Sequence, residues 1–280
     1  TDLTAAMPNE RSIDPSPSLR EFIAAYVLRS ERLGQQVLVR PVTASPDVLL
    51  IFTLDSRSEA FEYRTGRTRL LPAALIVGPQ TARRAEVFAR GNRDSVVVRF
   101  QPAGFYRLFH AGVEPLADTA LDACDVIGPE VGRLCVSLSA APTAECQVSL
   151  VNAFFEPRIT AARPRHAAAD AALAMLDAHG SSRVADMVRA SGLSARQFER
   201  AFREQMGISP KLFARAARLH FALGLKRINP THTWTRVSQE AGYFDQTHFV
   251  KDFKALAGQT PSTFPLVERE MPSLTARRPA

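Results

Sequence analysis

Side chains that can contact nucleic acid recur at matching positions in two segments near the end of the chain. In the first segment Phe198 and Phe202 lie about 40° apart around a helix, so both face the same side. The opposite faces carry Arg196, Arg200 and Arg203 in the first segment, and Thr247, Lys251 and Lys254 in the second. An arginine can donate two hydrogen bonds to guanine in the major groove, and a lysine contacts phosphates or single base atoms. Either segment alone would also fit a solvated face, but the two together predict a pair of DNA-reading helices.

An internal repeat places the two segments in register. From Ser194 and Asp245 onward, the matched residues are 51 positions apart; before that point the offset is 50, because the second copy has one extra residue in its turn. The later pairs are Phe198 with Phe249, Arg200 with Lys251, Phe202 with Phe253, Gly207 with Gly258, Pro210 with Pro261, and Phe213 with Phe264. Two copies are too few for a solenoid, so the pattern indicates a duplicated supersecondary unit.

Each copy has the sequence features of two helices joined by a tight turn. Gly192 suits the left-handed residue that ends a helix, and Ser194 with Gln197 three residues later forms a capping box for the next helix. Gly242 and Asp245 occupy the corresponding places in the second copy. A helix-turn-helix unit uses this arrangement to hold its second helix outward for the major groove.

A long helix is predicted between the two units. Ser209-Pro210 is typical of a helix start, and Asn229-Pro230 of a helix stop. Roughly 19 residues at about 1.5 Å each would span about 28 Å. This length could set the two reading helices close to one DNA turn apart, about 34 Å. A single chain could then read two successive major-groove segments.

The charge distribution agrees with a polyanionic partner for this part of the chain. Residues 166–280 hold 16 lysines and arginines against 10 aspartates and glutamates, a net charge of +6 out of +7 for the whole protein. Residues 1–165 hold 19 against 18, a net charge of +1. A basic region of this kind favours binding to nucleic acid, although a solvated basic face has the same composition.

The first half of the chain has the pattern of a β domain. Short β runs cover residues 37–42, 47–54, 60–64, 73–78, 84–89 and 94–100, with turn signals that include Thr65-Gly66 and Gly91-Asn92. Their spacing predicts an antiparallel sheet or small barrel, covered by helices over 103–112, 129–140 and 144–156. The fold class is therefore α+β. The expected domains are a flexible arm 1–18, a sensor or dimerisation domain 19–157, a linker 158–166, a DNA-binding domain 167–266 and a flexible tail 267–280.

The C-terminal residues resemble the AraC/XylS family of bacterial transcription regulators. The segment GYFDQTHFVKDFKALAGQTPSTF (242–264) is similar to the family signature, and GLSARQFERAFREQMGISP (192–210) to its first unit. The resemblance covers about residues 170–265 and implies two helix-turn-helix subdomains that bind promoter DNA. The implied base contacts fall on Arg196, Glu199 and Arg200 in the first unit, and on Gln246, Thr247, Val250 and Lys251 in the second.

The chain departs from the family pattern in two places. Glu199 is acidic where a neutral or basic residue is common, so it either reads cytosine or repels phosphate. Val237-Ser238 replaces the usual hydrophobic-alanine pair and weakens the packing expected of that helix.

The first domain also resembles the N-terminal region of certain AraC-type regulators. The matching residues are Pro46-Asp47, Gly78-Pro79-Gln80 and Val98-Arg99-Phe100-Gln101-Pro102. The resemblance implies a cupin-like domain that senses a small molecule or forms a homodimer. It also implies RNA polymerase as a partner if the protein is an activator. Arg83-Arg84 either meets an anionic effector or lies on an exposed hairpin rim.

Other chemistries lack their residue patterns. The sequence has no G-x-S-x-G, H-E-x-x-H, Walker A or G-x-G-x-x-G motif, so no enzyme activity, metal or cofactor is expected. No apolar run approaches the length of a membrane span, and a cytoplasmic protein is expected. Cys124, Cys135 and Cys146 are either apolar fillers or a redox sensor. The competing functions are a non-specific architectural DNA-binding protein and an enzyme tethered to DNA.

Overall fold

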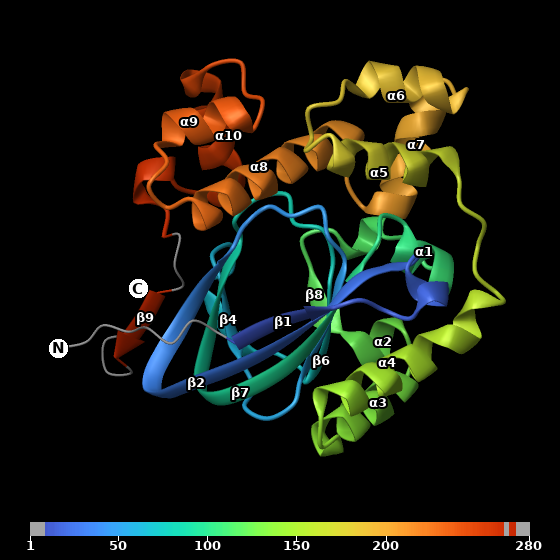
Figure 1. Ribbon diagram of the computed structural model, residues 1–280, viewed down its shortest axis with the longest axis vertical. Coiled ribbons are helices and arrows are strands. Elements are labelled where there is room, and N and C mark those ends of the chain that lie inside the picture. The colour runs from blue at the N-terminus through green and yellow to red at the C-terminus, as the bar shows by residue number, and fades with distance from the viewer. Residues whose placement is uncertain (1–8, 266–268, 273–280) are drawn as a thin grey trace.

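The computed structural model describes residues 9–265 and 269–272, and it divides into a β domain and a helical domain (Figure 1). The sheet and helices α1–α4 form the lower part of the view, and helices α5–α10 lie above them. The predicted α+β class, with a β domain followed by a helical region, is confirmed.

The β domain is built on one antiparallel sheet. Its strands are β1 (Asn9–Ile13), β2 (Ile23–Val42), β3 (Leu49–Thr53), β4 (Glu59–Glu62), β5 (Arg67–Leu70), β6 (Ala74–Val77), β7 (Ala85–Phe100), β8 (Ala120–Asp122) and β9 (Arg269–Pro272). The main path runs β1-β2-β7-β3-β6-β8, with β4 joining β5 to β7 and β9 joining β2. Strand β7 pairs with β3 along one half and with β4 along the other, so two strands share one of its edges.

The prediction of separate strands at 84–89 and 94–100 is wrong, because both belong to β7. Gly91 lies inside the strand with φ +70°, and β2 pairs with β7 on both sides of it. The register shifts between Arg32 and Val37 of β2, which is the signature of a β-bulge. Gly91 therefore bends a continuous strand where the sequence suggested a turn.

The ends of the chain differ from the expected arm and tail wherever the structure describes them. Within the expected arm, Asn9–Ile13 pairs with β2 as β1, since its backbone hydrogen-bonds to that strand. Within the expected tail, Arg269–Pro272 pairs with β2 as β9. Residues 1–8, 266–268 and 273–280, which complete the predicted arm and tail, lie outside the described residues.

Helices cover one face of the sheet, as the sequence predicts. They are α1 (Gly104–Phe109), α2 (Ala123–Val126), α3 (Glu130–Ala140) and α4 (Ala144–Ile159), with short 3-10 turns η1 (Pro17–Leu19) and η2 (Glu114–Leu116). Phe100 of β7 packs edge-on against Phe105 of α1 and Phe155 of α4, with ring centroids 5.5 and 5.8 Å apart. Burial of these aromatic side chains, within a core that also contains many aliphatic residues, stabilises the packing of the helices on the sheet.

The expected linker lies against α1. Helix α4 runs to Ile159, so it enters the predicted linker of 158–166. Beyond it, the backbone N–H of Arg163 donates to the Arg107 carbonyl at 3.0 Å, and Arg107 Nε donates to the Arg163 carbonyl at 2.8 Å. These reciprocal hydrogen bonds fix the connection to the β domain.

The helical domain has two hydrophobic clusters joined by one long helix. Its helices are α5 (Ala167–Asp177), α6 (Val184–Ser191), α7 (Ala195–Met206), α8 (Pro210–Ile228), α9 (Trp234–Glu240) and α10 (Gln246–Ala257), followed by the 3-10 turn η3 (Pro261–Thr263). One cluster is built on α5–α7 and the other on α9 and α10, and α8 contributes to both.

No helix within residues 9–265 is long and apolar enough to cross a membrane.

Candidate nucleic-acid interface

The first helix-turn-helix unit forms with the predicted turn chemistry. Gly192 ends α6 in the left-handed conformation, with φ +68°. Ser194 then caps α7: its hydroxyl accepts from the Gln197 N–H at 3.3 Å, and the Gln197 side chain accepts from the Ser194 N–H at 3.0 Å. This reciprocal capping box satisfies two N–H groups that a helix start leaves unpaired. The capping interactions fix where α7 begins.

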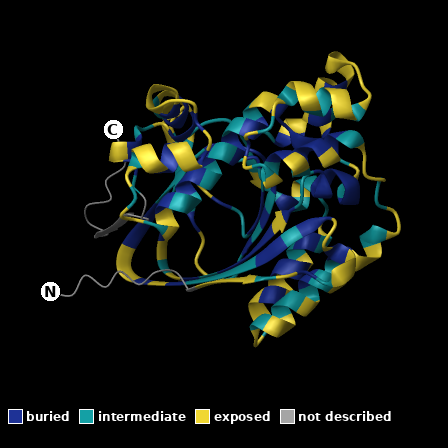
Figure 2. Cartoon of the chain, turned by 45° about the horizontal axis from the view of Figure 1, so that its top comes forward, coloured by how far each residue is buried: buried dark blue, intermediate teal, exposed yellow. Residues whose placement is uncertain are grey.

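Buried aromatic rings determine which face of α7 is turned outward. Phe198 and Phe202 are almost completely buried, and the Phe202 ring lies 5.4 Å from that of Phe213 on α8. The predicted contact residues of this helix, Arg196, Glu199, Arg200 and Arg203, are all exposed. Figure 2 shows exposed and buried residues alternating along the helices of this domain. The opposition of faces predicted for α7 is present in the structure.

Two of the three outward arginines of α7 are free to bind a ligand. Glu199 accepts from Nε and Nη2 of Arg203, four residues later, at 3.2 and 3.0 Å. Among the residues that the structure describes, no carboxylate pairs with Arg196 or Arg200. Exposed ion pairs of this kind contribute little to stability. Glu199 thus neutralises Arg203, leaving Arg196 and Arg200 as the uncompensated cations.

A shallow groove follows the outer face of α7. The first turn of α7 and its outward side chains line the groove together with Glu114 of η2, in the β domain. The groove is therefore cationic along the helix, with one carboxylate contributed by the other domain.

The second recognition helix, α10, has the same construction. Asp245 caps it by accepting from the His248 N–H at 2.7 Å, and Phe249 and Phe253 are fully buried. The predicted contact residues Gln246, Thr247, Lys251 and Lys254 are exposed, whereas Val250 is half-buried and packs on the cluster around α8. The Val250 side chain is therefore partly exposed at the surface and partly packed against the core.

The departure from the family pattern at Val237-Ser238 is accommodated within α9. Val237 is fully buried, and Ser238 is only 3% exposed. The Ser238 hydroxyl donates to the Thr235 carbonyl at 2.8 Å. A buried hydroxyl with a hydrogen-bond partner avoids most of the desolvation penalty, so the helix keeps its packing.

Each turn also exposes an apolar side chain that the residue-by-residue assignment did not include. Phe244 is 96% exposed immediately before the cap of α10, and Leu193 is 37% exposed at the equivalent place before α7. Each lies one position before the cap of its recognition helix, so the position of the caps was the signal that could have identified them. Apolar groups beside a recognition helix can contact thymine methyl groups.

A buried ionic network holds α10 against α8, and it too was absent from the predicted site. Asp252 is 5% exposed and accepts from Nε of Arg215 on α8 at 2.7 Å. The Tyr243 hydroxyl donates to the other carboxylate oxygen at 3.4 Å. Burial, and secondarily the charge of Asp252, raises the pKa of Tyr243, so the phenol stays protonated as a donor. The network fixes the rotation of α10 about its own axis.

The cysteines differ in exposure and acidity. Cys146 is exposed, whereas Cys135 is buried and Cys124 is half-buried. Desolvation raises the pKa of Cys135, and desolvation together with Asp122 raises the pKa of Cys124. Among residues 9–265, no group of three histidine, cysteine or acidic side chains is placed to hold a metal ion.

We expect an alkylating reagent at pH 8 to label Cys146 well before the other two thiols, because the thiolate is the reactive form and must be accessible. Mass spectrometry of the native protein should show one modified cysteine at early times, and Cys146→Ser should abolish this fast phase. Equally rapid modification of Cys124 would contradict its expected low reactivity and favour a redox-sensing role for this cysteine.

Comparison with known families separates the two domains. Residues 187–265 match the model of a helix-turn-helix domain. Residues 11–122 match the model of a domain of unknown function, DUF6597. No curated protein matches the chain. The helix-turn-helix units predicted from the repeat are thereby confirmed.

Among solved structures, the chain is similar to ToxT from Vibrio cholerae. The identity is 10%, the TM-score is 0.48, and the alignment covers 85% of this chain and 95% of that chain. A ToxT structure with a bound unsaturated fatty acid matches with 11% identity and a TM-score of 0.46, covering 85% and 92% of the two chains. A cupin protein from Desulfovibrio desulfuricans matches 36% of this chain and 93% of its own, with 16% identity and a TM-score of 0.23.

Proposed function

We propose that this chain, a DNA-binding transcription regulator with an AraC-type helix-turn-helix domain, recognises a specific promoter sequence. In this proposal α7 and α10 enter successive major-groove segments of one site. The N-terminal domain modulates binding, either by sensing a small molecule or by forming a homodimer. Promoter DNA as the ligand makes the cytoplasm the expected compartment, with RNA polymerase as a partner if the protein activates transcription.

The single observation that carries the proposal is the equivalence of the two exposed faces. Both recognition helices begin with a side-chain cap (Ser194 or Asp245), and both have an equivalent pair of buried phenylalanines and cationic or hydrogen-bonding side chains on the outer side. Within each helix, the buried rings fix the direction of the outward side chains. Such preorganised donors suit base-edge recognition better than a mobile basic tail would.

Each outward residue has a distinct proposed role. Arg196 and Arg200 on α7 contact base edges, and Gln246, Thr247 and Lys251 do so on α10. Lys254 and the Glu199-paired Arg203 lie at the helix ends and contact phosphates. Phe244 contributes an apolar contact beside α10, where a thymine methyl group would fit.

The main competing function is non-specific architectural binding. It predicts equal affinity for all duplexes and an affinity that depends only on salt. Selection of bound duplexes from a random library, followed by footprinting of the enriched sequence, separates the two. Sequence-specific recognition predicts a consensus with two protected segments about one helical turn apart.

Arg200→Ala is expected to weaken binding to the selected site by about 1–3 kcal/mol and to relax discrimination at one base pair. The reason is the loss of a two-bond contact from an uncompensated guanidinium. Binding should be measured by fluorescence anisotropy on the selected duplex and on its single-base variants. Arg20→Ala, which removes an exposed arginine paired with Asp14 in the β domain, is the matched charge control.

If Arg200→Ala lowered affinity equally on selected and random duplexes, Arg200 would be a phosphate contact and its proposed role in base recognition would be wrong.

A further inference from the structure

Both recognition helices end against the β domain, each in its last turn. The N–H of Val113 donates to the Glu204 carbonyl in the last turn of α7, at 2.8 Å. The N–H of Ala44 donates to the Leu256 carbonyl in the last turn of α10, at 3.0 Å. Carbonyls in the last turn of a helix have no partner within that helix. In each unit, the β domain therefore supplies a donor that the recognition helix lacks.

The glycines that end the two helices both lie close to the β domain. A methyl group at Gly207 would lie 2.7 Å from Cγ of Pro79 and 2.9 Å from Cγ1 of Val113. A methyl group at Gly258 would lie 3.0 Å from Cδ of Arg83. These two glycines are a matched pair of the internal repeat. The same structural end of each unit thus rests on the segment 79–83.

The segment 79–83 is held rigidly within its own domain. Gln80 and Ser45 exchange backbone hydrogen bonds of 2.8 and 2.9 Å, and the N–H of Thr81 donates to Asp118 at 2.8 Å. Arg83 is 9% exposed along its side chain; it donates to the Tyr63 hydroxyl at 2.8 Å and pairs with Glu86. Arg83 is therefore half-buried and held by partners within its own domain, whereas the neighbouring Arg84 is exposed.

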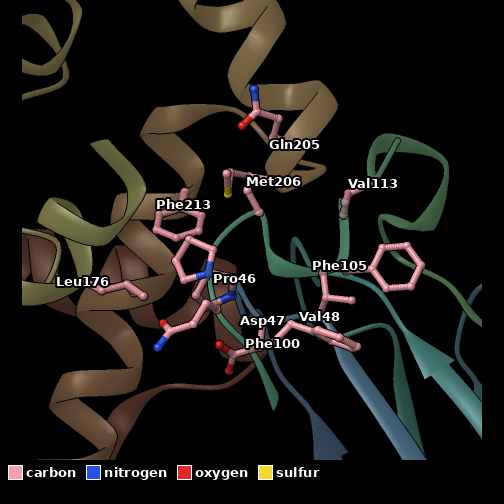
Figure 3. A pocket seen from close by; sticks show the side chains of 13 residues that line it. Pro46, Asp47, Val48, Phe100, Phe105, Val113, Leu176, Gln205, Met206 and Phe213 are labelled. Atoms are coloured by element: carbon pink, nitrogen blue, oxygen red, sulfur yellow. The ribbon is translucent and has the colours of Figure 1, made fainter. Parts of the chain in front are cut away.

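The boundary beside α7 is also closely packed. Pro46 and Val48 of the β domain face Leu176, Met206 and Phe213 of the helical domain across a narrow gap (Figure 3). The cavity that remains there is about 20 Å³, room for about one water molecule. Contacts this tight transmit position from one domain to the other.

We propose that the β domain is a brace that sets the spacing and angle between the two recognition helices. Among the described helices, α8 alone contributes residues to both hydrophobic clusters of the helical domain, whereas the 79–83 segment contacts the ends of both recognition helices. Pro79, Arg83, Ala44 and Val113 are then positioning residues for DNA recognition. The inference rests on the proposed function, because it assumes that α7 and α10 read one duplex.

The test compares duplexes in which the two recognised segments are moved apart or together by one or two base pairs. Each step turns one segment by about 35° around the duplex axis relative to the other. We expect the wild-type protein to lose about tenfold or more in affinity per step, which corresponds to about 1.4 kcal/mol. The double variant Gly207→Ala/Gly258→Ala should bind all spacings within about threefold while keeping its preference for the bases of each segment.

Gly66→Ala is the matched control, since Gly66 has φ +63° and no neighbour within 4 Å of an added methyl group. It introduces the same left-handed strain without a contact and should keep the wild-type spacing preference. If the glycine variant does not fold, as judged by circular dichroism, Pro79→Ala/Arg83→Ala tests the same contact from the other side.

The outcomes separate this inference from the proposed function. A wild-type protein without base preference refutes the proposed function itself. A wild-type protein that selects bases but accepts every spacing overturns the brace. A folded double variant that keeps the wild-type spacing preference, at any affinity, also overturns it.

Discussion

Phe253→Ala is expected to lower the free energy of unfolding of the helical domain by about 3–5 kcal/mol. The Phe253 side chain is fully buried, and its ring lies 5.3 Å from Trp234, 5.5 Å from Phe249 and 5.3 Å from Phe264. Truncation removes the apolar contacts of a whole ring and leaves a cavity among three aromatic neighbours, which cannot collapse without moving α9. The second unit should therefore lose most of its stability.

Trp234 makes this effect measurable. It is the only tryptophan of the chain, so its fluorescence during urea unfolding reports on the second unit. Phe244→Ala is the matched control because Phe244 belongs to the same unit and is 96% exposed. Its effect should stay within about 0.5 kcal/mol. If Phe253→Ala and Phe244→Ala lowered the free energy of unfolding equally, the buried and exposed faces of α10 would be assigned the wrong way round.

The features that the sequence predicted well are those determined by neighbouring residues. Ser194 and Gln197 form their capping box because both partners lie within one helical turn, and Gly192 ends α6 because only glycine adopts φ +68° without strain. The bounds of α8 follow in the same way from Ser209-Pro210 and Asn229. Local chemistry was sufficient for these elements.

The features that the sequence did not predict depend on partners far along the chain. Gly91 has the local chemistry of a turn, but β2 pairs on both sides of it and keeps β7 continuous. Gly207 and Gly258 entered the repeat only as matched glycines, since their neighbours Pro79 and Arg83 lie more than a hundred residues away. No local pattern contains these contacts, so the docking of the two domains had to come from the structure.

In the candidate site, too, local features were predicted from the sequence and features that depend on other parts of the structure were not. The outward arginines of α7 followed from helical periodicity, whereas the Glu199–Arg203 pair removes one of them from the set of free cations. Asp252 of α10 was not among the predicted site residues, and its partner Arg215 is on α8. Periodicity assigns a face to a residue, but the partner on a neighbouring helix decides what the residue does.

Asp252→Ala is expected to destabilise the second unit by about 3 kcal/mol, because removing one partner of a buried ion pair leaves the other charge, the Arg215 guanidinium, without a partner. The value lies at the low end of the usual range since the Arg215 side chain is 34% exposed and can be partly rehydrated. This change in the free energy of unfolding can be measured in urea, with Trp234 fluorescence as the signal. Glu199→Ala, which removes a carboxylate from an exposed arginine pair on α7, should change stability by about 0.5 kcal/mol or less.

A second variant distinguishes two causes of this destabilisation: the unpaired charge of Arg215 and the loss of packing around Asp252. In Asp252→Ala/Arg215→Met no unpaired guanidinium remains, so the double variant should recover more than half of the loss. DNA affinity should fall in the single variant even where it is fully folded, because α10 loses the contact that fixes its rotation against α8. If the double variant were as unstable as the single one, the carboxylate would act through packing or through Tyr243, and the ion pair would not position the helix.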